Sequence, residues 1–272
     1  MSTHVQLACL LEAAAPKPGN VSPGRDFADM TYGDLVRSAL ALGTAFAHGR
    51  VRRRGVGELI GDAVRATANV TRANTNLGIA LLFAPLARAA VTGAAGESLR
   101  EATEHTLAAL SVQDATAAFE AIVLAAPGGL GDDPEHDVRE PARVTLREAM
   151  AAAAGRDLIA SEYASGYEIV FGEGLRLLSA ALYGGAATLD AIVSLHVGLL
   201  AEHPDTLIAR KAGDEAAAAV TAAAREVREG TRSLADLDRQ LRADGHRLNP
   251  GATADVVAAT LLAALATGVT LP

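Results

Sequence analysis

Polar side chains that could do chemistry are gathered in a few short segments of this 272-residue chain. The first segment is Pro16-Lys17-Pro18-Gly19-Asn20-Val21. Its prolines restrict the backbone on both sides of Lys17, and Gly19 permits a close approach of another group. These residues predict a fixed phosphate contact through Lys17 or, equally well, an ordinary loop that ends the preceding helix.

A second segment, residues 69–78, contains Asn74, Thr75 and Asn76 between two apolar stretches. Asparagines are poor helix formers and both donate and accept hydrogen bonds, so the cluster favours a turn that faces a ligand. Upstream, Glu58 and Asp62 are spaced i, i+4 and lie side by side on one helical face. Such a pair suits Mg²⁺, and a solvated acidic face explains it equally well.

The third segment begins at His203 and places Asp205 at the expected start of a helix, followed within two turns by Arg210 and Lys211. Aspartate at a helix N-terminus is electrostatically favourable. Two cations beside a carboxylate fit a site for a nucleotide and a metal ion. They also fit a cluster of surface charges.

The fourth segment runs from Asn249 to Asp255. Asn249 as N-cap and Pro250 at the first helical position predict a helix start, where free N–H groups can hold a phosphate and Gly251 leaves room for it. Asp255 falls in the second turn of an otherwise apolar helix. A buried carboxylate needs a cation or a metal as its partner, so Asp255 is the strongest single candidate.

The elements that must position these segments are helices. Half of the residues are hydrophobic, only 3% are aromatic and there is no tryptophan, so the core consists of Ala, Leu, Val and Ile at helical spacing. We predict an all-α, single-domain multi-helix bundle over residues 1–272 with about 10–12 helices. The expected ranges are 3–15, 31–48, 57–69, 77–93, 97–110, 112–125, 143–154, 156–182, 186–202, 205–228, 232–244 and 251–267. On the helix from 156, Asp157, Glu162 and Glu168 are expected mostly at the surface, and Tyr163 and Tyr167 in the core.

Charge and composition exclude several classes of function. The net charge of −8 argues against a nucleic-acid binder. The basic run Arg50 to Arg54 is interpreted as a solvated loop, with phosphate steering as the alternative. The single cysteine, Cys9, fits a reducing compartment, and the N-terminus lacks the features of a signal peptide, so we expect a cytoplasmic protein. Residues 77–92 and 256–269 are apolar but fit buried core helices better than membrane spans.

In this order and at this separation, the segments resemble the triphosphoribosyl-dephospho-CoA synthase family over residues 7–265. The resemblance is carried by the PKPGNV loop at Lys17, Asp29-Met30, Asn74-Thr75 with Gly78, Asp205-Thr206, and Pro250-Gly251 with Ala254-Asp255. Phosphate-loop and dinucleotide-binding fingerprints, the HExxH motif and zinc-ligand spacings do not occur in the sequence.

The resemblance implies an all-α transferase that moves the 5-triphosphoribosyl group of ATP to the ribose 2′-hydroxyl of 3′-dephospho-CoA and releases adenine. ATP as a substrate and Mg²⁺ are implied with it, as are small nucleotides rather than nucleic acid or membrane as partners. By this mapping the catalytic candidates are Asp62, Asp205 and Asp255, and the metal candidates are these three and Glu58. The nucleotide-binding candidates are Lys17, Gly19, Asn20, Asn74, Thr75, Asn76, Arg210, Lys211 and Gly251.

The sequence departs from the family pattern at the acceptor side. Asn76 and Leu77 stand where the family has His and Lys, and Phe27 replaces a His before the Asp-Met pair. Asparagine cannot replace a general acid with the pKa of histidine. These departures indicate a divergent branch whose acceptor can differ, within another pathway of cofactor assembly.

Two other functions remain open from the residues. Residues 203–213 with Gly61-Asp62 resemble, more weakly, the Mg²⁺-dependent ADP-ribosylglycohydrolases, which would use water as the acceptor. A helical binding module without catalysis would instead scatter the polar segments over its surface. The Ala-rich apolar helices would also allow a homodimer.

Overall fold

The computed structural model describes residues 1–73, 75–125 and 138–271. Within these ranges the chain is helical, with one isolated bridge between Ser22 and Arg25 in place of any strand, which confirms the all-α prediction. The helices are α1 (Ser2–Ala14), α2 (Tyr32–Ala45), α3 (His48–Arg53), α4 (Val56–Ala68), α5 (Leu77–Thr92), α6 (Leu99–Ala108), α7 (Val112–Ala125), α8 (Leu146–Ala153), α9 (Leu158–Ser165), the π-helix η1 (Ile169–Gly174), α10 (Leu175–Tyr183), α11 (Thr188–Glu202), α12 (Thr206–Ala212), α13 (Asp214–Arg228), α14 (Leu234–Arg242) and α15 (Gly251–Ala266).

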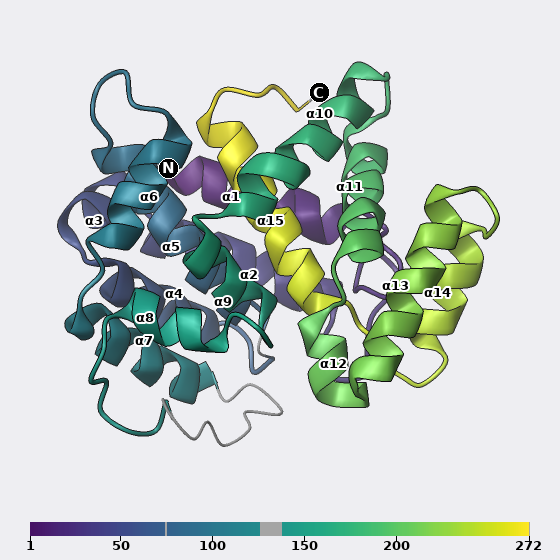
Figure 1. The fold of residues 1–272 in the computed structure, drawn as a ribbon, viewed down its shortest axis with the longest axis horizontal. Helices are drawn as coiled ribbons and strands as arrows, with labels where there is room; N and C mark the ends of the chain where they lie inside the picture. Colours follow the sequence, from purple (N-terminus) through teal and green to yellow (C-terminus); the bar gives the residue numbers. More distant parts are fainter. Residues whose placement is uncertain (74, 126–137, 272) are drawn as a thin grey trace.

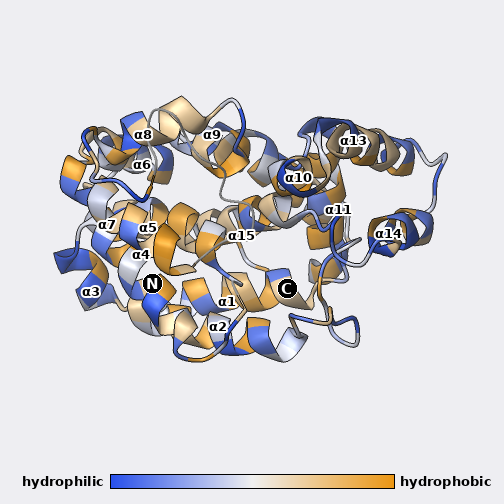
Figure 2. Cartoon of the chain, turned by 90° about the horizontal axis from the view of Figure 1, so that it is seen from below, coloured by the Kyte–Doolittle hydropathy of each residue, from blue (hydrophilic) through white to orange (hydrophobic). Residues whose placement is uncertain are grey.

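Helix α15 lies at the centre of the molecule (Figure 1). It packs against α1, α5, α11 and η1, and nearly all of its side chains are buried. Because most of these side chains are Ala, Val and Leu, neighbouring helices can pack on every side of it. Figure 2, which shows the molecule from below and coloured by hydropathy, has α15 and α5 among the most apolar elements. Asp255 on α15 therefore projects from a helix that the core surrounds.

The prediction of one continuous helix over residues 156–182 is wrong in its middle, where the helix is interrupted. Gly166 and Tyr167 both adopt the left-handed conformation, with φ of 71° and 61°, and end α9. Buried Glu162 then accepts hydrogen bonds from Ile169 N and Val170 N, both at 3.0 Å, at the start of η1. The prediction that Tyr163 and Tyr167 are core residues is confirmed, whereas Glu162 is fully buried rather than at the surface.

Two further boundaries differ from the predictions. The expected helix over 205–228 is divided at Gly213, whose φ of 94° separates α12 from α13. The basic run is not a loop, since residues through Arg53 form α3. Arg88 Nη1 donates to the carbonyls of Val51, Arg52 and Arg54, which supplies partners for the C-terminal end of this short helix.

No single helix within the described ranges combines the length and apolar composition needed to cross a membrane. Only α6 and α7 together, bent by 96° at their junction, pass that test by length and composition.

Candidate active site

Asp205 joins the beginnings of α12 and α15. Its Oδ1 accepts from Leu207 N at 2.9 Å and Ile208 N at 3.0 Å, while Oδ2 accepts from Thr253 N at 2.7 Å and Thr253 Oγ1 at 2.8 Å. The side chain is fully buried. Four donors occupy the lone-pair positions of this carboxylate, so its surroundings are those of a capping residue and not of a metal ligand or a base.

The start of α15 differs from the predicted cap. Pro250 occupies the N-cap position and the helix begins at Gly251, so Asn249 does not cap it. Asn249 Oδ1 instead accepts from Asn20 Nδ2 at 2.6 Å, and Asp205 satisfies the first turn of α15. A Cβ on Gly251 would lie 2.6 Å from Leu207 Cδ2, so this glycine allows α12 to pack closely on α15.

Asp255 lies one turn into α15 and remains partly accessible. Burial, followed by the carboxylates of Glu12, Asp205 and Asp157, raises its pKa well above the ordinary aspartate value, and Arg210 opposes the shift. Glu12 belongs to α1, Asp157 and Asp205 are the N-cap residues of α9 and α12, and Arg210 lies on α12. Asp255 and Asp157 are thus the accessible members of a group of carboxylates at the N-terminal end of α15.

The positive side of this group comes from α12. Arg210 Nη1 lies 3.7 Å from Asp157 Oδ2, and both side chains are about one-third exposed. Lys211 is partly buried, which lowers its pKa, and the charge of Asp29 acts against that effect. Leu158 N donates to Thr206 Oγ1 at 3.1 Å and so ties the start of α9 to the start of α12. Of the two predicted nucleotide-binding cations, Arg210 therefore lies beside Asp157 and Asp255, and Lys211 lies near Asp29 and Asp205.

Lys17 is buried rather than exposed to solvent. Its Nζ lies 2.8 Å from Glu12 Oε1 and also donates to the Glu12 carbonyl. His196 on α11 is fully buried, has no hydrogen-bond partner on either ring nitrogen within the described residues, and has a pKa lowered first by burial and then by Lys17. The predicted contact between Lys17 and a phosphate would require Lys17 to exchange its Glu12 partner.

Helix α14 holds the rest of the Lys17 loop. Asp238 Oδ1 accepts from Gly19 N at 2.9 Å, and Arg242 donates to the carbonyl of Asn20. Gly19 has a φ of 73°, and a Cβ there would lie 2.8 Å from Leu241 Cβ. The loop conformation thus depends on glycine at this position, and Gly19 and Asn20 have structural partners in place of a free surface.

The asparagine-rich segment leads into α5 opposite Asp255. Asn74 lies outside the described residues, Thr75 Oγ1 is 2.6 Å from Ser38 Oγ, and buried Asn76 donates weakly to Thr67 Oγ1 at 3.4 Å. A Cβ on Gly78 would lie only 2.0 Å from Asp255 Oδ2. The glycine in the first turn of α5 therefore makes room for the Asp255 carboxylate.

Glu58 and Asp62 belong to a different part of the molecule. Asp62 lies within 4 Å of Arg50, Arg54 and Arg65, and Glu58 pairs with Arg54 at 2.5 Å while accepting from Gly55 N at 3.0 Å. Guanidinium groups already neutralise both carboxylates, so these surroundings do not suit a metal cation. No described interaction connects them with the α12–α15 junction.

The resemblance to the family implies Mg²⁺, which requires side chains that can serve as its ligands. Within the described part of the chain, no three His, Cys, Asp or Glu side chains are arranged to hold a metal ion. Mg²⁺ in nucleotide sites is usually held by one or two carboxylates together with phosphate oxygens and waters. Asp255 and Asp157 suit that mode of binding, whereas an all-protein cage does not fit.

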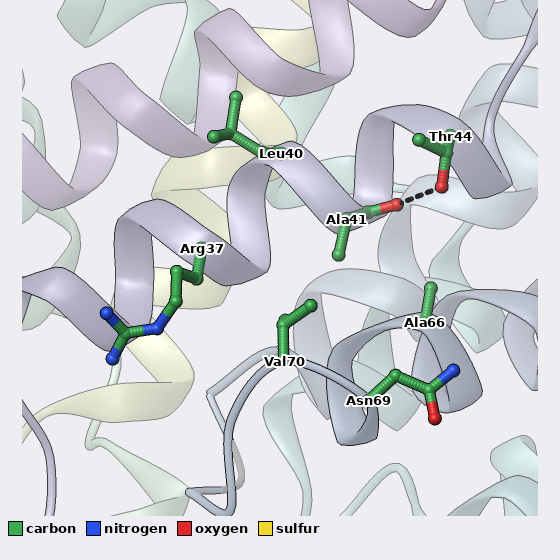
Figure 3. Close-up of a pocket in the computed structure, with 7 residues that line it drawn as sticks. All are labelled: Arg37, Leu40, Ala41, Thr44, Ala66, Asn69 and Val70. Carbon is green, nitrogen blue, oxygen red and sulfur yellow. Dashed lines mark hydrogen bonds between the residues drawn. The ribbon is translucent and has the colours of Figure 1, made fainter.

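A shallow surface pocket lies between α2 and the end of α4 (Figure 3). It is lined by Arg37, Leu40, Ala41, Thr44, Ala66, Asn69 and Val70. The lining is mostly apolar and offers no carboxylate, so it provides no alternative centre for group transfer.

Glu12 and Asp157 are the members of the site that the sequence reasoning missed. Glu12 is the only charged residue among residues 5–16, and a lone carboxylate on an apolar helix is a signal that could have found it. Asp157 precedes an apolar run and caps α9 by accepting from Ile159 N and Ala160 N. That capping pattern was visible, but its position beside Arg210 depends on the tertiary fold.

Comparison with known proteins identifies the family of the chain. The family model for ATP:dephospho-CoA triphosphoribosyl transferase matches residues 1–270. The crystal structure of a proposed triphosphoribosyl-dephospho-CoA synthase from Archaeoglobus fulgidus is 30% identical, with a TM-score of 0.69. The similarity covers 86% of this chain and 99% of the archaeal chain. No curated protein matches the sequence significantly.

The molecule is therefore an all-α transferase. The chain belongs to the ATP:dephospho-CoA triphosphoribosyl transferase family, as its match over residues 1–270 shows. This assignment confirms the resemblance seen in the sequence and favours an ATP-dependent transferase over an ADP-ribosylglycohydrolase or a non-catalytic binding module.

Proposed function

We propose that the protein transfers the triphosphoribosyl group of ATP to a hydroxyl of a CoA-type acceptor at the junction of α12 and α15. The observation that carries this proposal is Asp255. It is a partly accessible carboxylate on the central apolar helix, beside the cation Arg210 and opposite the glycine that leaves room for it. An isolated carboxylate on such a helix would be costly without a function or a partner.

Asp255 is proposed as the base for the acceptor hydroxyl. The hydroxyl oxygen forms the new bond to the anomeric carbon of ATP as the bond from that carbon to adenine breaks. The hydroxyl proton passes to Asp255, and the departing adenine takes a proton from solvent. Burial and neighbouring carboxylates raise the pKa of Asp255 and make it a stronger base than an exposed aspartate.

Arg210 and Lys211 are proposed to hold the triphosphate. Both lie on α12, and the Asp205 contacts fix that helix relative to the first turn of α15. Mg²⁺ would neutralise phosphate charge, held by phosphate oxygens together with Asp157, which leaves Asp255 free to act as the base. Positioning the triphosphate and the ribose relative to the acceptor lowers the entropic part of the barrier.

The acceptor is proposed to differ from that of the typical family member. Phe27 lies between polar partners, with its ring centroid 5.4 Å from that of His246 and 5.7 Å from the guanidinium carbon of Arg242. Asn76 is buried against Thr67. Neither residue offers the acid-base chemistry of the histidine that the family pattern has at that position.

The test is incubation of the protein with ATP, Mg²⁺ and a panel of hydroxyl acceptors, starting with 3′-dephospho-CoA, while free adenine is measured. Adenine release that depends on an acceptor is expected. Absence of adenine with every CoA-type acceptor would contradict the proposal.

Asp255→Asn tests the assigned base. The variant keeps the size of the side chain but cannot accept the proton, so we expect kcat for adenine release to fall at least about 100-fold. The far-ultraviolet circular dichroism of the variant should match that of the wild type. Asp190→Asn, an exposed aspartate in the first turn of α11, is the matched control and should retain activity. A loss of helicity in Asp255→Asn would assign this residue a structural role instead.

A further inference from the structure

A cluster of basic side chains lies away from the candidate active site, at α3. A surface pocket there is lined by Arg50, Arg53, Arg54 and Glu58. The three arginines are spaced i, i+3 and i+4, so they project from one side of the helix and the residue that follows it. Figure 2 shows α3 as a hydrophilic element at the edge of the molecule, at the opposite end from α13 and α14.

The backbone that presents these arginines is fixed from beneath. Arg88 on α5 donates to the carbonyls of Val51, Arg52 and Arg54 at 2.7, 3.0 and 2.8 Å. Val51 itself is fully buried in the core. The guanidinium groups above it therefore extend from a fixed backbone. This reduces the conformational entropy that the protein loses when a ligand binds.

The nearby carboxylates do not neutralise the pocket. Five arginines, at positions 50, 52, 53, 54 and 65, outnumber the three carboxylates of this region, Glu58, Asp62 and Asp114, and Asp114 is held by Gly57 N at 2.9 Å. Both oxygens of Glu58 are engaged, by Arg54 and by Gly55 N, and the contact of Asp62 with Arg50 is long at 3.4 Å. Within the described residues the side chain of Arg53 makes no ion pair or hydrogen bond, unlike those of Arg50 and Arg54. On a chain with a net charge of −8, this excess of positive charge is a local exception.

We propose that the Arg50–Arg53–Arg54 pocket is a separate binding site for a small polyphosphate, recognised through its phosphate groups. Guanidinium groups bind phosphate oxygens in a bidentate manner, and three of them at the end of one helix match a chain of linked phosphates better than a single phosphate. Free triphosphate and the triphosphate of a nucleotide share this chemistry. The site is independent of the reaction proposed at Asp255.

The test measures binding of inorganic triphosphate to the full-length protein by calorimetry, with hydrogen–deuterium exchange to locate it. Residues 48–62 should become protected in the wild type. Arg53→Gln should weaken binding at this site about tenfold and remove the protection. Arg52→Gln removes the same charge from the same helix outside the pocket lining, so it should weaken binding less than about threefold. Arg210→Gln, at the active-site junction, should leave the protection of residues 48–62 unchanged.

ATP and inorganic triphosphate should protect this segment at similar concentrations, because only phosphate is recognised. The proposal is overturned if triphosphate gives no protection of residues 48–62, if ATP alone protects them, or if Arg52→Gln and Arg53→Gln weaken binding equally. The last result would indicate a diffuse electrostatic field in place of a site. Since binding is measured directly, failure of adenine release would not affect these outcomes.

Discussion

Gly78 and Asp255 approach each other more closely than any other residue type at position 78 would allow. An added Cβ would lie 2.0 Å from Asp255 Oδ2 and 2.6 Å from its Cγ, so the carboxylate would have to move. The motif that places glycine two residues after Asn76 therefore has a geometric reason. Without a side chain at position 78, the first turn of α5 leaves space for the carboxylate of the proposed base.

Gly78→Ala is expected to lower kcat for adenine release by at least about tenfold, because even a small misplacement of a reacting group is costly. Helix content should not fall, since alanine favours helix over glycine. Gly33→Ala is the matched control: Gly33 is also the second residue of its helix, and its added Cβ would meet nothing closer than 3.4 Å. Equal activity of the two variants would contradict the proposed position of Asp255.

The buried pair of Lys17 and Glu12 allows stability and function to be separated at the residue scale. Lys17→Met leaves Glu12 buried without its cation, so we expect a loss of about 3 kcal/mol in the free energy of unfolding. The double variant Lys17→Met/Glu12→Leu should recover most of that loss, as measured by urea denaturation. If the double variant is stable and active, Lys17 has no phosphate contact. If it is stable and inactive, the pair takes part in the reaction.

At the scale of elements, one side chain serves two helix N-termini: the Asp205 carboxylate accepts from amides in the first turn of α12 and in the first turn of α15. Asp205→Ala leaves the amides of Leu207, Ile208 and Thr253 without an acceptor in a buried position. We expect a loss of about 3 kcal/mol in the free energy of unfolding. Ser233→Ala removes an ordinary cap at α14 and should lose only about 1 kcal/mol. Similar losses in both variants would show that the connection between α12 and α15 adds little.

The helices themselves were largely predictable, because apolar periodicity and start signals are local. The range 112–125 agrees at both ends with α7, and α5, α11 and α15 lie within two residues of their predicted bounds at either end. The break after Ser165 was not predictable, because the apolar pattern continues through Gly166 and Tyr167. Gly166 supplies a local glycine C-cap, and tertiary contacts hold the segment that follows: Tyr167 donates to the carbonyl of Leu82, and buried Glu162 accepts from two amides of η1.

For the whole molecule, the structure brings some of the predicted site residues together and separates others. Arg210 lies near Asp255 because α12 and α15 are joined, and the order of motifs indicated this grouping. Glu58 and Asp62 have the spacing of a metal pair, yet arginines from α3 and α4 neutralise them. Spacing along one helix says which side chains share a face but not which charges the fold places opposite them.

Glu162 couples global stability to pH. Burial raises its pKa from 4.5 to about 7, so the folded protein holds the proton more tightly than the unfolded chain does. Stability is therefore lost as pH rises through this interval. In urea denaturation, the free energy of unfolding of the wild type relative to Glu162→Gln should fall by up to about 3 kcal/mol between pH 4.5 and 7. Parallel curves for the two proteins would contradict the raised pKa.

The shared acceptor at Asp205 also has a consequence for motion. Thr253 is 48 residues from Asp205 along the chain, yet its amide and those of Leu207 and Ile208 bond to the same carboxylate. One helix end cannot open without disturbing the acceptor of the other, so native-state hydrogen exchange of these three amides should report a common opening event. The junction of α12 and α15 would then behave as one cooperative unit. If the nucleotide binds there as proposed, entry of substrate and departure of adenine would have to occur by movement of the surrounding segments, with this junction remaining closed through each turnover.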